Sequence, residues 1–320
     1  MKISKARFFM VDRILEETDI NSYRIYQFIK KNMSIELRHR KLNEFYTIQH
    51  IFRNTNISVV IYDQNNNFRI ERWRTPADKL IKTKDEPYNF AEYQKIFCDE
   101  NNSNAQGSSK PLGDEKDSDD DKSVTELLQE LTGNKTFAKD DEGVDVTEKL
   151  LNGVPTRGFD ADLFDAKEGI VYEFLRRKSP YTTNLKTHPM RYTWTTGEKK
   201  DNRQKFISLW DFCTHYNLKL VLVNYSRNEE DSDIIKLIFP KDIDRKVGFL
   251  GDEEFALKKN DFVEYLKNAN RKYLLNYSIG NLEIKPEDYR TKVYRTKDGK
   301  PEYIYIQKLN KWSNKINGKS

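Results

Sequence analysis

Four short apolar segments with one amphipathic helix among them constrain the fold of this 320-residue chain most strongly. β-branched and aromatic residues, which favour strands, are concentrated at 159–164, 170–175, 218–225 and 234–239. Between the second and third segments, residues 201–216 predict a helix whose apolar stripe consists of Phe206, Leu209, Trp210 and Cys213. Strands that alternate with a long helix predict an α/β layer, in which helices flank a central mixed sheet.

An N-terminal unit is predicted ahead of this core. Residues 1–98 are expected to form an α+β unit, with helical spacing from Tyr23 to Leu37 and from Leu42 to Phe52. A hairpin of strands at 57–62 and 68–73 follows, around the turn at 63–67.

A linker, the core and a C-terminal extension complete the predicted organisation. Residues 99–122 have a solvated, acidic composition that predicts a disordered linker. The core at 123–250 is expected to begin with helices near 123–131 and 146–151. Residues 251–320 predict a basic extension of one helix, 260–275, and one hairpin, 291–295 with 303–306. The sequence shows no evident internal repeat.

The net charge of +5 conceals an uneven distribution. Residues 114–148 contain 13 acidic and 4 basic side chains, so the rest of the chain carries +14. The tail from Ala256 to Ser320 alone carries +8. A basic body suits a polyanion, because Lys and Arg displace condensed counterions from phosphates. The alternative is that the many lysines only keep the surface solvated.

Several classes of protein are disfavoured by what the sequence lacks. No apolar run is long enough for a membrane span, and the one at residues 8–11 is too short for a signal peptide. Cys98 and Cys213 make neither a disulfide framework nor a zinc motif, and we expect a cytoplasmic protein. Phosphate-binding P-loop and nucleophile-elbow motifs are absent from the sequence.

Acidic residues in the two strands at 159–164 and 170–175 are the candidates for chemistry. Asp160 and Asp162 share one face of their strand, because strand side chains alternate between faces. Glu173 interrupts the apolar strand that follows. Like charges on one face repel unless a cation lies between them, and Mg²⁺ prefers carboxylate, water and phosphate oxygens. The pattern therefore predicts a Mg²⁺ site at Asp160, Asp162 and Glu173.

Residues 123–240 resemble the PD-(D/E)xK nuclease superfamily, whose members share a helix, three strands, a helix and a strand. The family places an Asp on one strand, matched by Asp160 or Asp162, and Glu-x-Lys on its hairpin partner, where Glu173 matches the Glu. Leu175 stands where the family has Lys. Lys205 on the following helix, or Arg177 on the Glu173 face, is the expected replacement.

This resemblance implies a restriction-endonuclease-like α/β fold and a Mg²⁺-dependent endonuclease of the restriction or defence type. Mn²⁺ is expected to substitute for Mg²⁺, double-stranded DNA to be the substrate, and a homodimer to cut both strands. Asp162 and Glu173 would be the principal ligands and Asp160 an auxiliary one, with Lys205 or Arg177 as the catalytic cation. The N-terminal unit and the basic tail would position or read the DNA.

Other interpretations stay open at the level of the sequence. Asp160 and Asp162 suit an exposed edge equally well, and Glu173 suits a structural ion pair with Arg176 or Arg177. The missing Lys favours a non-catalytic nucleic-acid-binding protein on a degenerate nuclease fold. A protein-interaction module with an acidic linker is a third possibility.

Overall fold

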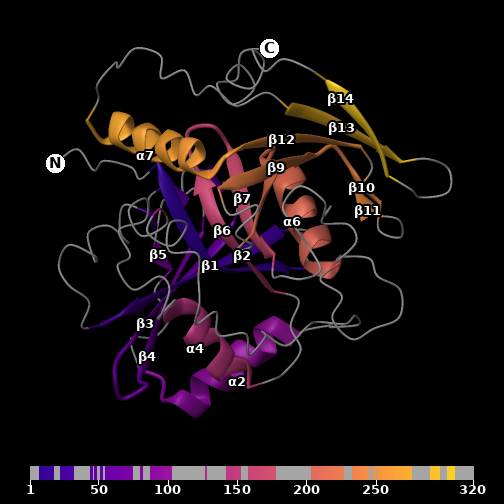
Figure 1. The fold of residues 1–320 in the computed structure, drawn as a ribbon. Helices are drawn as coiled ribbons and strands as arrows, with labels where there is room; N and C mark the ends of the chain where they lie inside the picture. Colours follow the sequence, from indigo (N-terminus) through magenta and orange to yellow (C-terminus); the bar gives the residue numbers. More distant parts are fainter. Residues whose placement is uncertain are drawn as a thin grey trace. The chain divides into compact units, whose positions relative to one another are not determined.

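A computed structural model describes two compact units, divided between Ala161 and Asp162 within one strand. We describe each unit by itself (Figure 1). The described residues are 7–17, 22–31, 44–45, 47–48, 51–52, 55–74, 80–81, 87–102, 127, 142–152, 158–177, 203–226, 233–244, 248–249, 251–275, 289–295 and 301–306. The chain is mixed α/β, with mostly antiparallel strands and few helices among these residues.

The first unit contains a sheet in the order β1-β2-β3-β4-β5. Its strands are β1 (Phe8–Glu17), β2 (Ser22–Lys30), β3 (Asn56–Tyr62), β4 (Phe68–Arg74) and β5 (Leu80–Ile81). β1 and β2 form an antiparallel pair, β2 and β3 are parallel, and β3 and β4 are antiparallel. The predicted hairpin at 57–73 is confirmed, and Asp63 holds its turn by accepting hydrogen bonds from the backbone of Asn65 and Asn67.

The predicted helix from Tyr23 to Leu37 is wrong over residues 22–30, which form strand β2. β1 was not predicted either. Side chains of β2 are buried on both faces, as Ile25 and Tyr26 are both fully covered. A strand that is buried on both faces has no apolar–polar alternation to distinguish it from a helix. The second predicted helix agrees with the structure where it is described, since Glu44, Phe45, Thr47, Ile48 and Ile51 are helical.

Two helices cover one face of the first sheet: α2 (Phe90–Asn102) and α4 (Glu142–Leu151), which contact each other (Figure 1). Two buried aromatic residues of α2, Tyr93 and Phe97, pack on Phe68 and Phe28 of the sheet. Residues 99–102, assigned by sequence to the acidic linker, instead complete α2, and Asn101 is buried. The rest of the predicted linker lies outside the described residues. α4, predicted as part of the core at 123–250, contacts β1 and β2.

The second unit contains the strand order β14-β13-β12-β9-β8-β7-β6. The predicted strands correspond to β6 (Phe159–Asp165), β7 (Ile170–Arg177), β8 (Lys219–Ser226) and β9 (Ile234–Pro240). The C-terminal hairpin is β13 (Tyr289–Arg295) with β14 (Pro301–Ile306). β12 (Asp252–Lys258), which was not predicted, pairs with both β9 and β13. A separate small pair consists of β10 (Ile243–Asp244) and β11 (Gly248–Phe249).

Two predicted helices of the second unit are confirmed, α6 (Arg203–His215) and α7 (Lys259–Leu275). Phe212 of α6 contacts Phe164, whereas Phe262 of α7 contacts Tyr172. Since Phe164 is paired with Val171, the neighbour of Tyr172, the two helices cover opposite faces of the sheet. None of the helices that the structure describes is long and apolar enough to cross a membrane.

Candidate functional site

Glu173 is a buried carboxylate at the centre of strand β7. Only 3% of the residue is exposed, although it stands in a strand of apolar and aromatic residues. β7 lies between β6, its antiparallel hairpin partner, and β8, which runs parallel to it. A charged group in this position is costly unless a cation compensates for its lost hydration.

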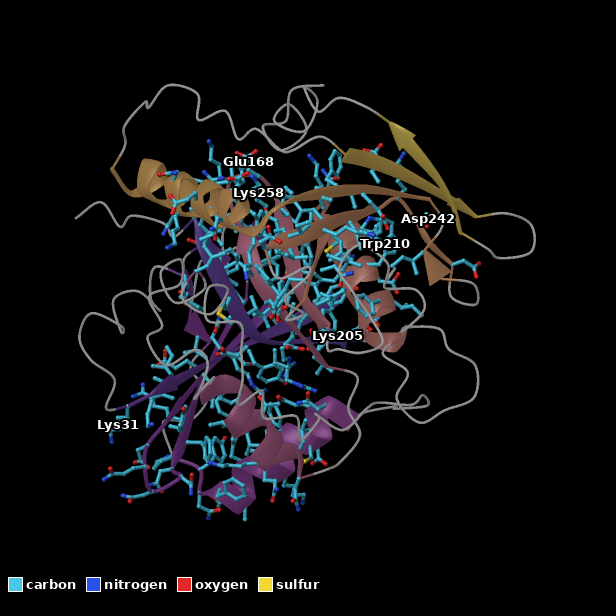
Figure 2. The ribbon with its side chains drawn as sticks, viewed as in Figure 1. Lys31, Glu168, Lys205, Trp210, Asp242 and Lys258 are labelled. Atoms are coloured by element: carbon cyan, nitrogen blue, oxygen red, sulfur yellow. The ribbon has the colours of Figure 1, made fainter. Side chains whose placement is uncertain are left out.

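Lys205 of α6 supplies that cation. Its Nζ lies 2.6 Å from Glu173 Oε1, and its side chain is 29% exposed, against 4% for the Glu173 side chain. Lys205 lies in the first turn of α6 (Figure 2), directly before a buried stripe. The stripe consists of Phe206, Leu209, Phe212 and Cys213, whereas Trp210, which was predicted for it, is only half-buried. The packing of that stripe fixes the helix on the sheet and brings Lys205 to Glu173. The residue that the sequence favoured as a replacement for the missing Lys thus contacts the predicted acid.

Asp162 lies on β6, across the hairpin from Glu173. Asp162 directly precedes Leu163, which pairs with Tyr172, and Glu173 directly follows Tyr172. Asp162 Oδ2 accepts a 2.6 Å hydrogen bond from the backbone N–H of Phe174. A carboxylate that accepts a backbone N–H in this way is held in one orientation. Asp162 is half-buried, so the hairpin carries two acids, one covered and one partly open to solvent.

Asp160 falls in the first unit, where its charge acts on Arg13. Arg13 is fully buried and donates a 2.8 Å hydrogen bond from Nε to Asn101 Oδ1. Its pKa is lowered to about 10, chiefly because burial removes water from the guanidinium, while the charges of Tyr26 and Asp160 act in the opposite direction. The structure therefore gives Asp160 a cationic neighbour of its own. Its role as an auxiliary metal ligand stays a prediction.

The other predicted cations lie beyond what the structure describes. The backbone of Arg177 ends β7, but the side chains of Arg176 and Arg177 lie outside the described residues, as does the basic and aromatic segment 178–200. The alternative pairing of Glu173 with either arginine is therefore not tested. Asp165, a third acid on β6, is buried and accepts hydrogen bonds from the backbone N–H of Lys167 and Glu168, which makes it a turn-forming residue.

The donor set of Asp162 and Glu173 fits a hard divalent cation. Both residues offer carboxylate oxygens, and Mg²⁺ commonly takes one or two carboxylates together with water and phosphate oxygens. Within the described part of the chain, no group of three or more His, Cys, Asp and Glu side chains is placed to hold a metal ion.

The chain was compared with protein-family models, curated proteins and solved structures. No protein-family model matches the chain, and neither the curated proteins nor the solved structures contain a match to it.

Proposed function

We propose that the chain is a Mg²⁺-dependent DNA endonuclease that resembles the PD-(D/E)xK superfamily. One arrangement carries the proposal: Lys205 of α6 contacts the buried Glu173 at 2.6 Å, and Asp162 of the preceding strand accepts a hydrogen bond from the N–H of Phe174, the residue after Glu173. Because Leu175 occupies the family's Lys position, a nuclease of this type needs a cation from elsewhere. The first turn of α6 provides one.

The order of elements in the second unit supports the same proposal. Hairpin β6–β7 is followed by α6, and β8 then runs parallel beside β7. The resemblance implies three strands before the helix, and β6 and β7 account for two of them. The proposed restriction-endonuclease-like core therefore comprises at least β6, β7, α6 and β8.

Each residue of the proposed site has a distinct role. Asp162 and Glu173 would hold Mg²⁺, which supplies an activated water and stabilises negative charge on the phosphodiester. The backbone bond to Phe174 orients Asp162, and burial of Glu173 limits its movement. The ammonium of Lys205 orients the attacking water and stabilises the charge that develops at phosphorus. Arg177 stays an additional candidate cation.

The remaining parts of the proposal concern partners and location. Double-stranded DNA is the proposed substrate because the chain outside residues 114–148 is strongly basic. A homodimer would supply the second centre that is needed to cut both strands. A restriction or defence role and a cytoplasmic location complete the proposal.

Mg²⁺-dependent cleavage of supercoiled plasmid tests the proposal, with Glu173→Ala as the variant. Glu253→Ala is a matched control, because Glu253 is also buried, with 5% of its side chain exposed, and pairs with Lys241 at 3.1 Å. We expect Glu173→Ala to abolish cleavage while retaining DNA binding, measured by fluorescence anisotropy without Mg²⁺. Glu253→Ala should cleave normally. Wild-type DNA binding without cleavage would instead support the non-catalytic nucleic-acid-binding alternative.

A further inference from the structure

The two units repeat the same succession of secondary structure. In the first, the antiparallel pair β1–β2 leads through helical residues around Phe45 and Ile48 to β3, which is parallel to β2, and then to antiparallel β4. In the second, the antiparallel pair β6–β7 leads through α6 to β8, which is parallel to β7, and then to antiparallel β9. Each unit therefore contains a hairpin, a crossover helix, a parallel strand and an antiparallel strand.

An aspartate-to-backbone hydrogen bond occurs at the same place in both hairpins. In the second unit, the N–H of Phe174 donates to Asp162 Oδ2 at 2.6 Å. In the first, the N–H of Phe28 donates to Asp12 Oδ2, also at 2.6 Å. In each case the acid lies on the first strand of the hairpin and the donor on the second. By this hydrogen bond, Asp12 corresponds to Asp162 and Phe28 to Phe174.

The parallel strands continue this correspondence residue by residue. Gln27 and Glu173 precede the two phenylalanines, and they pair with Val59 of β3 and Leu222 of β8. Three residues farther along, Lys30 pairs with Tyr62 and Arg176 pairs with Tyr225. The second hairpin strands read Tyr-Gln-Phe-Ile-Lys-Lys at 26–31 and Tyr-Glu-Phe-Leu-Arg-Arg at 172–177. The two strand pairs therefore have the same register and the same order of side-chain types.

The copies differ at the residues that matter for metal chemistry. Gln27 occupies the place of Glu173, and its amide Nε2 donates a 2.7 Å hydrogen bond to the carbonyl of Met10. A carboxylate cannot make that bond, and a neutral amide is a weaker ligand than a carboxylate for a hard cation. The residue before the first buried helical Phe also differs: it is Glu44 before Phe45, but Lys205 before Phe206. The first unit thus has the same succession of elements, with Gln27 and Glu44 at the positions of Glu173 and Lys205.

We propose that the first unit is a second, non-hydrolytic copy of the nuclease-like core, silenced by Gln27, so that each chain has one divalent-metal centre and cuts one DNA strand. This inference rests on the proposed function of Asp162 and Glu173. With one centre in each chain, cleavage of both DNA strands needs two chains, which is consistent with the proposed homodimer.

Mn²⁺ titration of the full-length protein, followed by electron paramagnetic resonance of the free ion, counts the centres without reference to activity. We expect about one Mn²⁺ per wild-type chain, none in Glu173→Gln, and one in Gln27→Ala. Gln27→Glu restores the carboxylate and should raise the count to about two, and the additional Asp12→Asn change should return it to one. Thermal melting of each variant confirms that it is folded. If Gln27→Glu does not fold, the Mn²⁺ counts of the wild type, Gln27→Ala and Glu173→Gln still decide whether the chain has one metal centre.

The outcomes separate this inference from the proposed function. Two ions per wild-type chain, or an ion lost in Gln27→Ala and kept in Glu173→Gln, would overturn the inference. A folded Gln27→Glu variant that still binds one ion would overturn Gln27 as the silencing residue. The expected counts without any plasmid cleavage would uphold one metal centre per chain and refute hydrolysis. No Mn²⁺ binding at all would refute both.

Discussion

The hairpin β1–β2 and the hairpin β6–β7 have the same aspartate-to-amide hydrogen bond, but the residue that precedes the donor is Gln27 in one and Glu173, paired with Lys205, in the other. Asp12 and Asp162 each accept a backbone N–H at 2.6 Å. Beside them stand Gln27, bound to a carbonyl, and Glu173, bound to Lys205. In both units the aspartate therefore binds the backbone of the second hairpin strand, whereas the residue before the donor is a neutral amide in one unit and a carboxylate paired with a lysine in the other.

The largest expected difference between the two hairpins is in the cleavage rate after each aspartate is removed in turn. Asp162→Ala should lower plasmid cleavage by about a thousand-fold, since a proposed metal ligand is lost, whereas Asp12→Ala should change cleavage by less than about three-fold. Both variants lose a charge-assisted hydrogen bond, so each should lower the free energy of unfolding by about 1–3 kcal/mol. Initial cleavage rates and urea unfolding measure the two effects. An equal loss of cleavage in both variants would contradict the division of roles.

A second test compares ion pairs at equivalent positions of β4 and β9. Arg69 pairs with Ile61, one residue before Tyr62, and Lys236 pairs with Asn224, one residue before Tyr225. The Arg69–Glu71 pair is 3.3 Å long with 47% of the Arg69 side chain exposed, whereas the Lys236–Glu254 pair is 3.1 Å long with 6% of the Lys236 side chain exposed.

Lys236→Met should therefore destabilise the protein far more than Arg69→Met. Removing one partner of a buried pair leaves an uncompensated charge and costs about 3–5 kcal/mol, whereas an exposed pair contributes about 0–1 kcal/mol. Urea unfolding measures both changes. Lys236→Met combined with Glu254→Leu should recover most of the loss, because it removes both buried charges. Similar unfolding midpoints for the two single variants would contradict the burial argument.

A third test addresses Lys205 itself. Lys205→Ala should lower the single-turnover cleavage rate by about a hundred-fold, as expected when a group that stabilises transition-state charge is removed. DNA affinity should change little, and Lys205→Arg should recover part of the rate because it retains a positive charge. The pH dependence of the rate is a second readout. If Lys205 only stabilises the fold, Lys205→Ala would melt early and leave the pH profile of the remaining activity unchanged.

A fourth test compares one glycine from each unit. A Cβ at Gly158 would overlap the buried guanidinium of Arg13, whereas a Cβ at Gly169 would only touch Leu218, at 3.7 Å. Gly169 has a φ of +63°, so its substitution carries a backbone cost. Gly158→Ala should lower the free energy of unfolding by about 1–3 kcal/mol through overpacking, and Gly169→Ala by about 1 kcal/mol through strain. Thermal melts that rank the two variants in the opposite order would contradict the close approach of Arg13.

The smallest expected effect concerns the two thiols. Burial raises the pKa of both Cys98 and Cys213, and Cys213 is fully buried whereas Cys98 is partly exposed. Since the thiolate is the reactive form, Ellman's reagent at pH 8 should label Cys98 a few-fold more slowly than a free thiol and leave Cys213 unlabelled. Labelling of Cys98 should accelerate as the pH rises. Two thiols labelled at equal rates in the folded protein would contradict the packing of α6.

Local pattern was sufficient to predict much of the second unit. The elements β6, β7, α6, β8 and β9 were predicted because each has a clear apolar pattern with a turn residue or proline at its end. Lys205 was also predicted, with Arg177 as the alternative, as the cation that replaces the Lys missing at Leu175, whereas its ion pair with Glu173 came from the structure. β1 and β2 were not predicted, because polar residues such as Arg13 and Gln27 are buried among their apolar ones, so the segments show neither alternation nor the unbroken apolar run of β8. The repeat itself was missed, although Tyr-Gln-Phe-Ile-Lys-Lys and Tyr-Glu-Phe-Leu-Arg-Arg were the signal for it.

The sequence by itself determined where the acids lie along the chain and which segments alternate as strands, because side-chain periodicity is a local property of the backbone. Only the tertiary structure decided which acid is buried, which lysine reaches it, and that Asp12 and Asp162 hold equivalent positions. Those facts depend on strand register and helix packing between residues far apart in the chain, and no local pattern specifies such pairings.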